Sequence, residues 1–198
     1  MVKRIIDTAG SLIGLLLLMP LFLLVAIVIK VDSSGPALYW QERIGRGGVP
    51  FRLFKFRTMH INADQIQSIT VGKRDSRITA VGFFLRRFKL DELPQLMNVL
   101  KGEMSLVGPR PELRKFTDLY TEEQRSVLAV RPGMTDPASI QFRNENEMLE
   151  GKTDPISYYV NEILPVKLSI NIKYLQDRSV WKDLRIIFVT LLSIFKRN

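Results

Sequence analysis

Residues 8–29 read TAGSLIGLLLLMPLFLLVAIVI, and this stretch decides the architecture because it contains no charged side chain. An α-helix rises ~1.5 Å per residue, so about 20 such residues are long enough to cross a bilayer. The run is longer than the apolar part of a signal peptide, and no small-x-small cleavage site follows it. We therefore expect a membrane helix that stays with the protein rather than a cleaved signal.

Pro20 lies in the middle of this run. Proline removes one helical hydrogen bond and clashes with the preceding turn, so a kink is expected. Lys3 and Arg4 precede the run and Lys30 follows it, so the distribution of positive charge assigns neither end alone to the cytoplasm. Two arrangements are open: a re-entrant helix that is broken at Pro20 and returns to the same face, or a tilted anchor that spans the membrane and tolerates its proline.

The overall composition limits the chemistry that the protein can perform. The 198 residues are enough for one compact domain beside the apolar helix, and 46% of them are hydrophobic, so the chain can bury a core. Lys and Arg number 29 against 20 Asp and Glu, an excess that indicates an anionic partner such as nucleic acid, anionic lipid or a phosphorylated substrate. There is no Cys, and His60, which we expect at the surface, is the only His. Thiol chemistry and multi-His zinc sites are therefore excluded, and a metal would need oxygen ligands, as Mg²⁺ does.

After a turn at residues 32–36, DSSGP, the pattern predicts one domain. Residues 37–44 and 51–59 are typical of two strands of a hairpin. The second strand, FRLFKFRTM, interleaves Phe with Arg and Lys, which fits either a half-buried strand with a cationic face or base stacking on nucleic acid. Residues 61–77 read as a polar loop. Residues 83–88 and 180–195 favour helices that lie at a lipid interface, with Trp181 near the headgroups, or pack on the core, and residues 163–175 predict a further helix.

A second informative stretch is KLDELPQLMNVLKGEMSLVGPRP, at residues 89–111. Its apolar residues recur at helical spacing, at Leu93, Leu96, Met97 and Leu100. The spacing predicts a helix that begins near Asp91 and ends near Lys101, with Gly102 just past its end. Acids at a helix N-terminus are stabilised by ~0.3–1 kcal/mol, so capping by Asp91 is one explanation of the acidic pair.

Catalysis is the other explanation of the pair formed by Asp91 and Glu92. Adjacent helical residues point about 100° apart, so the two carboxylates can take different roles, one as nucleophile and one as metal partner or proton acceptor. Pro109 and Pro111 restrict Arg110 between them, which reduces the entropy lost when a guanidinium binds phosphate. Carboxylates, a rigid Arg and further cations together indicate phosphoryl transfer assisted by a divalent ion.

These motifs resemble a known family. The stretch KLDELPQLMNVLKGEMSLVGPRPEL is similar to the signature of the bacterial polyprenyl-phosphate sugar-1-phosphate transferases, also called monotopic phosphoglycosyl transferases. Further matches are QERIGRGGVPFRLFKFRTM, the turn RPGMTD, the RN at Arg143 and Asn144, and the N-terminal hydrophobic helix with its central proline. The resemblance covers essentially the whole chain, at the length of the minimal catalytic form.

The resemblance implies an α+β fold in two parts. A Pro-broken, re-entrant membrane helix at residues 1–31 precedes a small, mainly helical cytosolic domain at residues 32–198, with a β-hairpin and interfacial amphipathic helices. The implied location is the cytoplasmic face of the bacterial inner membrane. The implied partners are a UDP-sugar donor, undecaprenyl phosphate as acceptor and membrane lipid, with no nucleic acid, and a homodimer is left open.

The resemblance also implies a ping-pong reaction that needs Mg²⁺. Asp91 would attack the sugar-linked phosphorus, UMP would leave, and undecaprenyl phosphate would then take the phosphosugar from the aspartyl enzyme. Asp91 would also neighbour the metal, and Glu92 would be a supporting acid. The candidate substrate-binding residues are Arg110, as a phosphate clamp, with Lys55, Arg57, Arg86 and Arg143. For Arg110, pairing with Glu112 or another acid is the structural alternative, and for Lys55 and Arg57 it is a position that faces solvent.

Two departures from the family pattern limit what can be transferred. Met19 stands where relatives often have Ser before the proline, so the depth and angle of the break are not determined. The segment DPASIQFRNE after RPGMT also differs from many relatives, so the sugar and the glycan pathway are not determined. Two functions without catalysis stay open, a membrane-tethered protein that binds nucleic acid or anionic lipid and a membrane scaffold, and neither requires Asp91.

Overall fold

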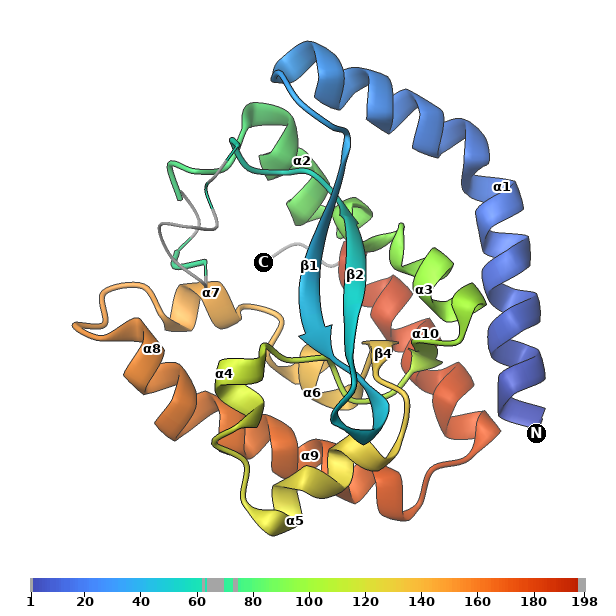
Figure 1. Cartoon of the computed structure of the whole chain (residues 1–198), viewed down its shortest axis with the longest axis vertical. Helices are drawn as coiled ribbons and strands as arrows, with labels where there is room; N and C mark the ends of the chain where they lie inside the picture. Colours follow the sequence, from blue (N-terminus) through green and yellow to red (C-terminus); the bar gives the residue numbers. More distant parts are fainter. Residues whose placement is uncertain (1, 62, 64–69, 73–74, 196–198) are drawn as a thin grey trace.

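The computed structural model describes residues 2–61, 63, 70–72 and 75–195. Helices and two small sheets occur together in it, which confirms the mixed helical and strand character that was expected. Figure 1 shows one long helix, α1, along the side of a domain that has the β1–β2 hairpin at its centre. The polar loop expected at residues 61–77 falls largely outside the described residues.

Helix α1, Val2–Asp32, contains the apolar stretch and stays helical through Pro20. Within the described part of the chain, it is the one helix long and apolar enough to cross a membrane, and only 11% of its most apolar window is buried. In Figure 1 the helix changes direction part-way along its length as it follows the domain. The side chains that it turns away from the domain include Leu12, Ile13, Leu16, Leu17, Leu23, Leu24 and Ile27. So long an exposed apolar surface indicates membrane association.

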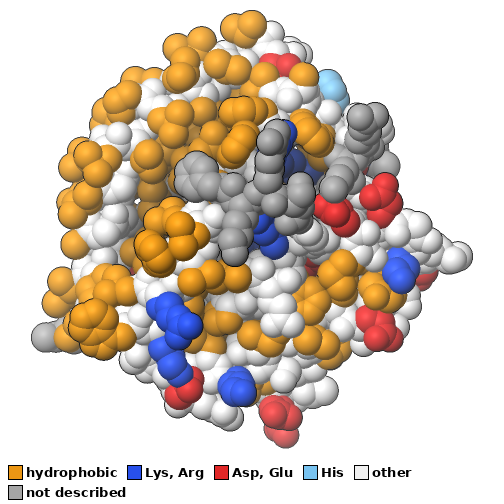
Figure 2. Space-filling view, turned by 180° about the vertical axis from the view of Figure 1, so that it is seen from behind, with side chains coloured by type: hydrophobic (Ala, Val, Ile, Leu, Met, Phe, Trp, Pro, Cys, Tyr) orange, Lys and Arg blue, Asp and Glu red, His pale blue; other side chains and the backbone are white. Residues whose placement is uncertain are grey.

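Other exposed apolar side chains lie on the two helices that were expected at an interface. Helix α2, Ala80–Arg87, exposes Phe83 and Phe84, and helix α10, Val180–Phe195, exposes Trp181 and Phe188. Figure 2, which views the molecule from behind, shows hydrophobic side chains gathered along the edge that α1 occupies and continuing below it. The exposed residues of α2 and α10 are therefore compatible with a lipid interface.

Strands β1, Leu38–Ile44, and β2, Pro50–Phe56, form the predicted antiparallel hairpin. Leu53 and Phe56 of β2 are both buried, and because side chains alternate along a strand they pack into different apolar clusters from opposite faces of the hairpin. Lys55, opposite Tyr39 of β1, lies two residues after Leu53 and so projects from the same face as Leu53. The hairpin thus supplies a cation beside a packed apolar face.

The acidic pair lies on a short 3₁₀ turn, η3, Leu90–Glu92, between α2 and helix α3, Gln95–Lys101. The helix predicted near residues 91–101 is thus confirmed from Gln95 onward, and Gly102 ends it with a left-handed φ of 88°, as expected. The first turn of the prediction was wrong, because Pro94 rather than Asp91 holds the N-cap position of α3.

A parallel pair of short strands, β3, Ser105–Val107, and β4, Gly133–Thr135, was not predicted. It brings the RPGMT turn against the VGPRP segment. Their backbones approach so closely that a Cβ at Gly133 would lie 2.1 Å from the backbone nitrogen of Gly108. Any side chain at position 133 would clash with the backbone of Gly108, so this residue has to be glycine.

The remaining elements are η1, which lies in the loop between β1 and β2, and short helices and turns that form a helical layer beneath the hairpin (Figure 1). Their bounds are Arg46–Gly48 for η1, Arg114–Thr117 for α4, Glu122–Arg125 for α5, Ser126–Ala129 for η4, Pro137–Gln141 for α6, Glu145–Met148 for α7, Pro155–Tyr158 for α8, Tyr159–Ile163 for the π-helical turn η5 and Leu164–Gln176 for α9. Helices α9 and α10 confirm the two helices predicted near the C-terminus. The largest apolar cluster joins Phe116, Tyr120, Val127, Leu149, Tyr159, Ile163, Leu164 and Leu168.

Candidate active site

The backbone turns sharply just before the acidic pair. Lys89 has a φ of 55°, the one positive φ of a non-glycine residue among the residues that the structure describes. A left-handed residue with a side chain is strained, and such strain concentrates at functional sites. This turn directs the chain from α2 into η3, so that Asp91 points into the protein instead of capping a helix.

Asp91 is only 5% exposed. Its Oδ1 is buried and has no hydrogen-bond partner within the described ranges. Burial raises the pKa of Asp91, and the neighbouring charge of Glu92 raises it further. Asp91 does not cap a helix, so that explanation of the acidic residue is wrong. Its buried oxygen without a partner is unusual and calls for another explanation.

Glu92 has the opposite surroundings. Lys55 Nζ lies 3.2 Å from Glu92 Oε1, and Arg110 donates from Nη1 to Oε2 at 3.2 Å and from Nη2 to Oε1. Burial alone would raise the pKa of Glu92, but the charges of Arg110 and Lys55 outweigh it and hold that pKa well below its ordinary value. The two adjacent acids are thus driven towards different protonation behaviour, which is a feature of catalytic pairs.

Arg110 is held by its neighbours in the fold. Gly108 N–H donates to the Thr135 carbonyl at 3.0 Å, Gly133 N–H donates to the Pro109 carbonyl at 2.9 Å, and Arg43 Nη1 donates to the Pro111 carbonyl at 3.2 Å. The prolines therefore act together with β4 and β1 to fix the segment that carries Arg110. The structure brings its guanidinium to Glu92, and Glu112 instead pairs with Arg43 at 3.5 Å and Lys167 at 3.9 Å.

Arg86, in the last turn of α2, also faces the site. Its Nη2 donates to Thr70 Oγ1 at 3.1 Å, while its Nη1 is buried without a hydrogen-bond partner in the part of the chain that is described. Burial lowers the pKa of Arg86, and the charge of Asp91 is the largest influence that opposes this shift. Two buried polar atoms, Asp91 Oδ1 and Arg86 Nη1, thus lack partners in the same corner of the molecule.

Two of the predicted substrate-binding residues do not join this corner. The guanidinium of Arg57 is buried and donates to the carbonyls of Ser33, at 2.7 Å, and of Ser34, so it closes the turn after α1. The substrate-binding role expected for Arg57 stays a prediction. Arg143 lies after α6, half-buried, and the structure gives no contact between it and the acids among the described residues. His60 is exposed, as expected.

Two cations near the acids were missed from the sequence. Lys89 carries charge that lowers the pKa of both Asp91 and Glu92. Arg43, on β1, donates to the Pro111 carbonyl, and it lies close enough to Arg110 for the charge of Arg110 to lower the pKa of Arg43. Lys89 lies two residues before Asp91, so its closeness in the sequence could have identified it as a site residue. Arg43 is far from the acidic pair in the sequence, and only the packing of the hairpin brings it there.

A magnesium ion fits the donor set of this corner only in part. Across the described residues no group of three or more acidic or His side chains lies close enough to hold a metal. Glu92 is engaged by two cations, so Asp91 is the one carboxylate of the pair with an oxygen free to coordinate. Mg²⁺ commonly binds through one or two carboxylates with the rest of its shell from substrate phosphates and water, which suits a single available oxygen.

Comparison with known proteins places the chain. The model of the family described as bacterial sugar transferase matches residues 1–197. The UDP-glucose:undecaprenyl-phosphate glucose-1-phosphate transferase of Caulobacter vibrioides is 39% identical over 195 residues, which cover 97% of this chain and 69% of the relative. The exopolysaccharide production protein ExoY of Rhizobium meliloti is 34% identical over 98% of this chain and 85% of its own length.

A longer relative shows that the matched region also occurs inside larger proteins. The UDP-N-acetylgalactosamine-undecaprenyl-phosphate N-acetylgalactosaminephosphotransferase of Aeromonas hydrophila is 35% identical over 98% of this chain but only 43% of its own length. The family match extends from the apolar helix through the acidic pair to α10. The chain therefore belongs to the bacterial sugar transferase family.

Proposed function

We propose that this protein transfers a sugar-1-phosphate from a UDP-sugar to undecaprenyl phosphate, with Asp91 as the nucleophile. The observation that carries the proposal is the contrast within the dyad: Asp91 Oδ1 is buried without a partner among the described residues, while adjacent Glu92 is fully engaged. An oxygen kept free among cations is suited to attack phosphorus. The named activities of the relatives support the class of donor and acceptor.

The first half-reaction forms one bond and breaks one. Asp91 Oδ1 attacks the phosphorus that carries the sugar, the bond from that phosphorus to the bridging oxygen breaks, and UMP leaves with its electron pair. A phosphosugar remains on Asp91 as an acyl phosphate. In the second half-reaction a phosphate oxygen of undecaprenyl phosphate attacks the same phosphorus, and the Asp91 carboxylate is restored as the leaving group. The product is a lipid pyrophosphate-linked sugar, and no redox partner is needed.

The charges around the dyad suit this sequence. A carboxylate that attacks a diphosphate brings negative groups together, so fixed cations must lower the barrier. Arg86 Nη1 and the cations at Lys55, Lys89 and Arg110 surround the acids. Glu92 holds Lys55 and Arg110 in place, so we assign it an orienting role and not a second attack.

Asp91 would hold the Mg²⁺ ion that the family pattern implies. When bound, the ion supplies positive charge that offsets the phosphate oxygens and favours the ionised carboxylate. Its protein ligand would be the available carboxylate of Asp91, because Glu92 is already paired.

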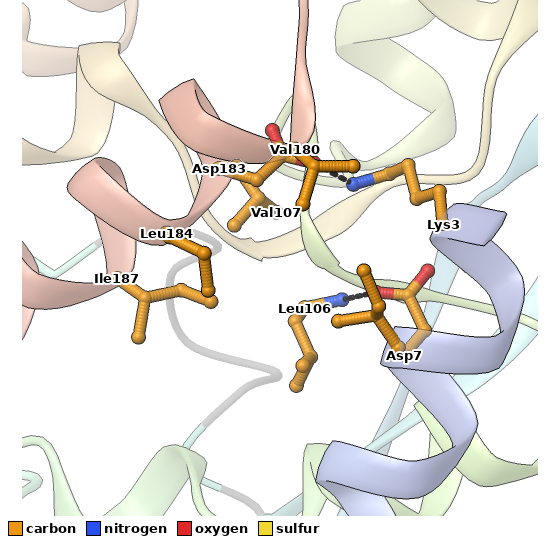
Figure 3. Close-up of a pocket in the computed structure, with 9 residues that line it drawn as sticks. Lys3, Asp7, Leu106, Val107, Val180, Asp183, Leu184 and Ile187 are labelled. Carbon is orange, nitrogen blue, oxygen red and sulfur yellow. Dashed lines mark hydrogen bonds and ion pairs between the residues drawn. The ribbon is translucent and has the colours of Figure 1, made fainter.

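We also propose that α1 is re-entrant, because both of its ends are held by the same domain. At the N-terminal end, Lys3 pairs with Asp183 of α10 at 2.5 Å and Asp7 accepts from Leu106 N–H at 3.0 Å (Figure 3). Arg4 Nη1 donates to the Val99 carbonyl at 2.7 Å.

At the other end of α1, the ring of Phe22 packs on Phe56 of β2 at 5.3 Å, and Arg57 binds the carbonyl of Ser33. A straight helix of this length would separate its ends by about 45 Å and leave one set of these contacts across the bilayer. A bend at Pro20 that returns α1 to the cytoplasmic face of the inner membrane satisfies both sets.

A donor screen tests the proposed function. Purified protein in lipid nanodiscs is given undecaprenyl phosphate, Mg²⁺ and a panel of UDP-sugars, and the release of UMP is measured. We expect one donor class to release UMP, and we expect EDTA to stop the release. Salt-sensitive binding to DNA or RNA without UMP release from any donor would contradict the proposal and favour the nucleic-acid alternative.

A further inference from the structure

A second group of buried polar side chains lies behind Arg110. Tyr159 donates from its hydroxyl to Glu112 Oε1 at 2.6 Å. Lys167 Nζ donates to Glu145 Oε2 at 2.7 Å and lies 3.4 Å from the Tyr159 hydroxyl and 3.9 Å from Glu112 Oε1. Glu112, Tyr159 and Lys167 are all less than 9% exposed. We call these four residues, Glu112, Tyr159, Lys167 and Glu145, the Glu112 chain.

A π-helical turn aligns two members of the Glu112 chain. Tyr159 begins η5, which leads directly into α9, where Lys167 lies. In an unbroken α-helix, side chains eight residues apart point about 80° apart. A π-turn takes up one extra residue, so the two side chains are left only about 20° apart and reach the same face. The irregular turn therefore has a definite result: Tyr159 and Lys167 meet Glu112 together.

The Glu112 chain is joined to Arg110 through two peptide bonds, by way of Pro111. Glu112 follows Pro111, whose φ is fixed by its ring, and Pro111 follows Arg110. The Glu112 carbonyl accepts from Ile44 N–H at 2.9 Å, so both the backbone and the side chain of Glu112 are held. The place of Glu112 therefore limits where the guanidinium of Arg110 can reach.

The far end of the Glu112 chain is Glu145, the first residue of α7. The same short helix has a second connection to the site. Gly72 N–H donates to the Asn146 carbonyl at 2.8 Å, and two residues earlier Thr70 Oγ1 accepts from Arg86 Nη2. Arg86 is thus linked to α7 through residues 70–72, and Arg110 is linked to α7 through Pro111 and the Glu112 chain.

We propose that α7 is a shared anchor that positions Arg110, through the Glu112 chain, and Arg86, through residues 70–72. This inference rests on the proposed function, because it assigns the two arginines to the two phosphoryl groups of a nucleoside diphosphate donor. Those groups lie a fixed distance apart, so a common support for both guanidinium groups sets the spacing that the donor requires. Tyr159 is then a positioning residue, and it does not touch the reacting atoms.

A matched pair of variants tests the positioning without any substrate. Tyr159→Phe removes one hydroxyl and keeps the ring, whose centroid lies 5.1 Å from that of Phe116. Tyr174→Phe is the control, because Tyr174 is also on the α9 side, also buried, and also donates to a carboxylate, that of Asp183. We expect faster hydrogen exchange at the amides of Ile44, Gly108 and Gly133, whose hydrogen bonds hold this segment, in Tyr159→Phe and wild-type exchange there in Tyr174→Phe. Equal exchange in both variants would overturn the anchor, whatever the enzyme does.

The rate of the first half-reaction provides the second readout. A hydrogen bond to a charged group contributes enough that its loss lowers a rate by about tenfold, and we expect this loss for the UMP burst in Tyr159→Phe. Thr70→Val removes the hydroxyl that accepts from Arg86 and should also lower the rate of the UMP burst. Tyr174→Phe should keep the wild-type rate. In an Arg110→Lys background, Tyr159→Phe should lower the rate little further, because it acts through Arg110.

The outcomes separate this inference from the proposed function. Fully multiplicative losses of Tyr159→Phe and Arg110→Lys, or equal rates in the two tyrosine variants, would overturn the positioning role while UMP release by the wild type still supports the function. If the wild type released no UMP, the proposed function would fail, and the exchange measurement would still decide whether α7 anchors the segment of Arg110.

Discussion

Two buried clusters of charged groups lie near one another in this fold, and they differ in how completely their polar atoms are satisfied. In the Glu112 chain, Glu112 accepts from Tyr159 and Arg43, and Glu145 accepts from Lys167. In the corner around Asp91 and Glu92, Asp91 Oδ1 and Arg86 Nη1 have no partners among the residues that are described. Buried polar groups are normally paired because an unpaired group costs stability. The difference indicates that the Glu112 chain supports the fold, and it agrees with the proposed catalytic role of the corner around Asp91.

The largest expected effect comes from removing the unpaired carboxylate. Asp91→Asn should lower turnover by roughly 10³-fold or more, since it removes the proposed nucleophile while keeping the shape of the side chain. UMP release measured in nanodiscs checks this. Membrane flotation of the variant is the control and should match the wild type, because the contacts of α1 do not involve Asp91. Near-wild-type turnover with the accepted donor would refute the assignment.

Arg110→Lys gives the next largest effect on activity. Lysine keeps the charge but loses the planar fork that holds both oxygens of Glu92, so we expect turnover to fall by about 10²-fold. Arg52→Lys is a matched control on β2, because Arg52 is exposed and lies over the Trp40 ring, away from the dyad. Equal losses in both variants would show that general charge, and not the geometry at Glu92, is what matters.

The same chemical change should have opposite effects on the stability of the two clusters. Glu112→Gln removes the buried counter-charge of Arg43 and the farther of the two carboxylates near Lys167, and should lower the free energy of unfolding by about 3 kcal/mol. Asp91→Asn should raise it, because the pKa of Asp91 is raised by burial and the ionised form is therefore disfavoured in the folded state. Thermal unfolding of both variants in one detergent at pH 7 measures the two signs. Destabilisation by both changes would remove the distinction.

The pH dependence of stability should also separate the two acids of the dyad. The pKa of Asp91 lies above its ordinary 3.8, so the gain from Asp91→Asn should be full at neutral pH and disappear as pH falls through the folded pKa towards 3.8. The pKa of Glu92 lies well below its ordinary 4.5, so Glu92→Gln should lose stability at neutral pH, and this loss should shrink only below pH 4.5. Unfolding curves from pH 3 to pH 8 would reveal parallel profiles if this contrast is wrong.

The smallest effect is expected at Arg57, whose Nη1 and Nη2 atoms bind the turn after α1. Arg57→Lys should cost about 1–2 kcal/mol of stability through the bonds to Ser33 and Ser34, with unchanged turnover per folded molecule. Denaturation and UMP release on the same preparation check both statements. A loss of turnover without a loss of stability would return Arg57 to the substrate site.

Local patterns in the sequence predicted much of this fold. The apolar run, the hairpin, the end of α3 at Gly102 and the two C-terminal helices each depend on residues that are close in the sequence, and each was confirmed. The parallel pairing of β3 with β4 was not predicted, because three-residue strands give no periodic signal and their partners lie 28 residues apart, as Ser105 and Gly133 show.

The candidate site divides in the same way. The motif identified Asp91, Glu92 and Arg110, and the structure brings Lys55 and Arg86 to them. The sequence did not distinguish Arg57, which closes a turn, from Lys55 two residues before it. Lys55 lies on β2 and Arg57 follows its last residue, so the alternation of the strand alone predicts the same side for both side chains. The packing of the turn after α1 gives Arg57 the carbonyl of Ser33 as partner, whereas Lys55 pairs with Glu92.

The most direct test of the central claim is the detection of a phosphosugar on Asp91. Enzyme mixed with a labelled donor and Mg²⁺, without acceptor, is quenched and digested with trypsin, which releases residues 90–101, LDELPQLMNVLK, with both acids in one peptide. We expect this peptide to carry the mass of one phosphosugar, fragmentation to place it on Asp91, and undecaprenyl phosphate to remove it. An adduct on Glu92, or full turnover by an enzyme that never carries an adduct on this peptide, would contradict the account.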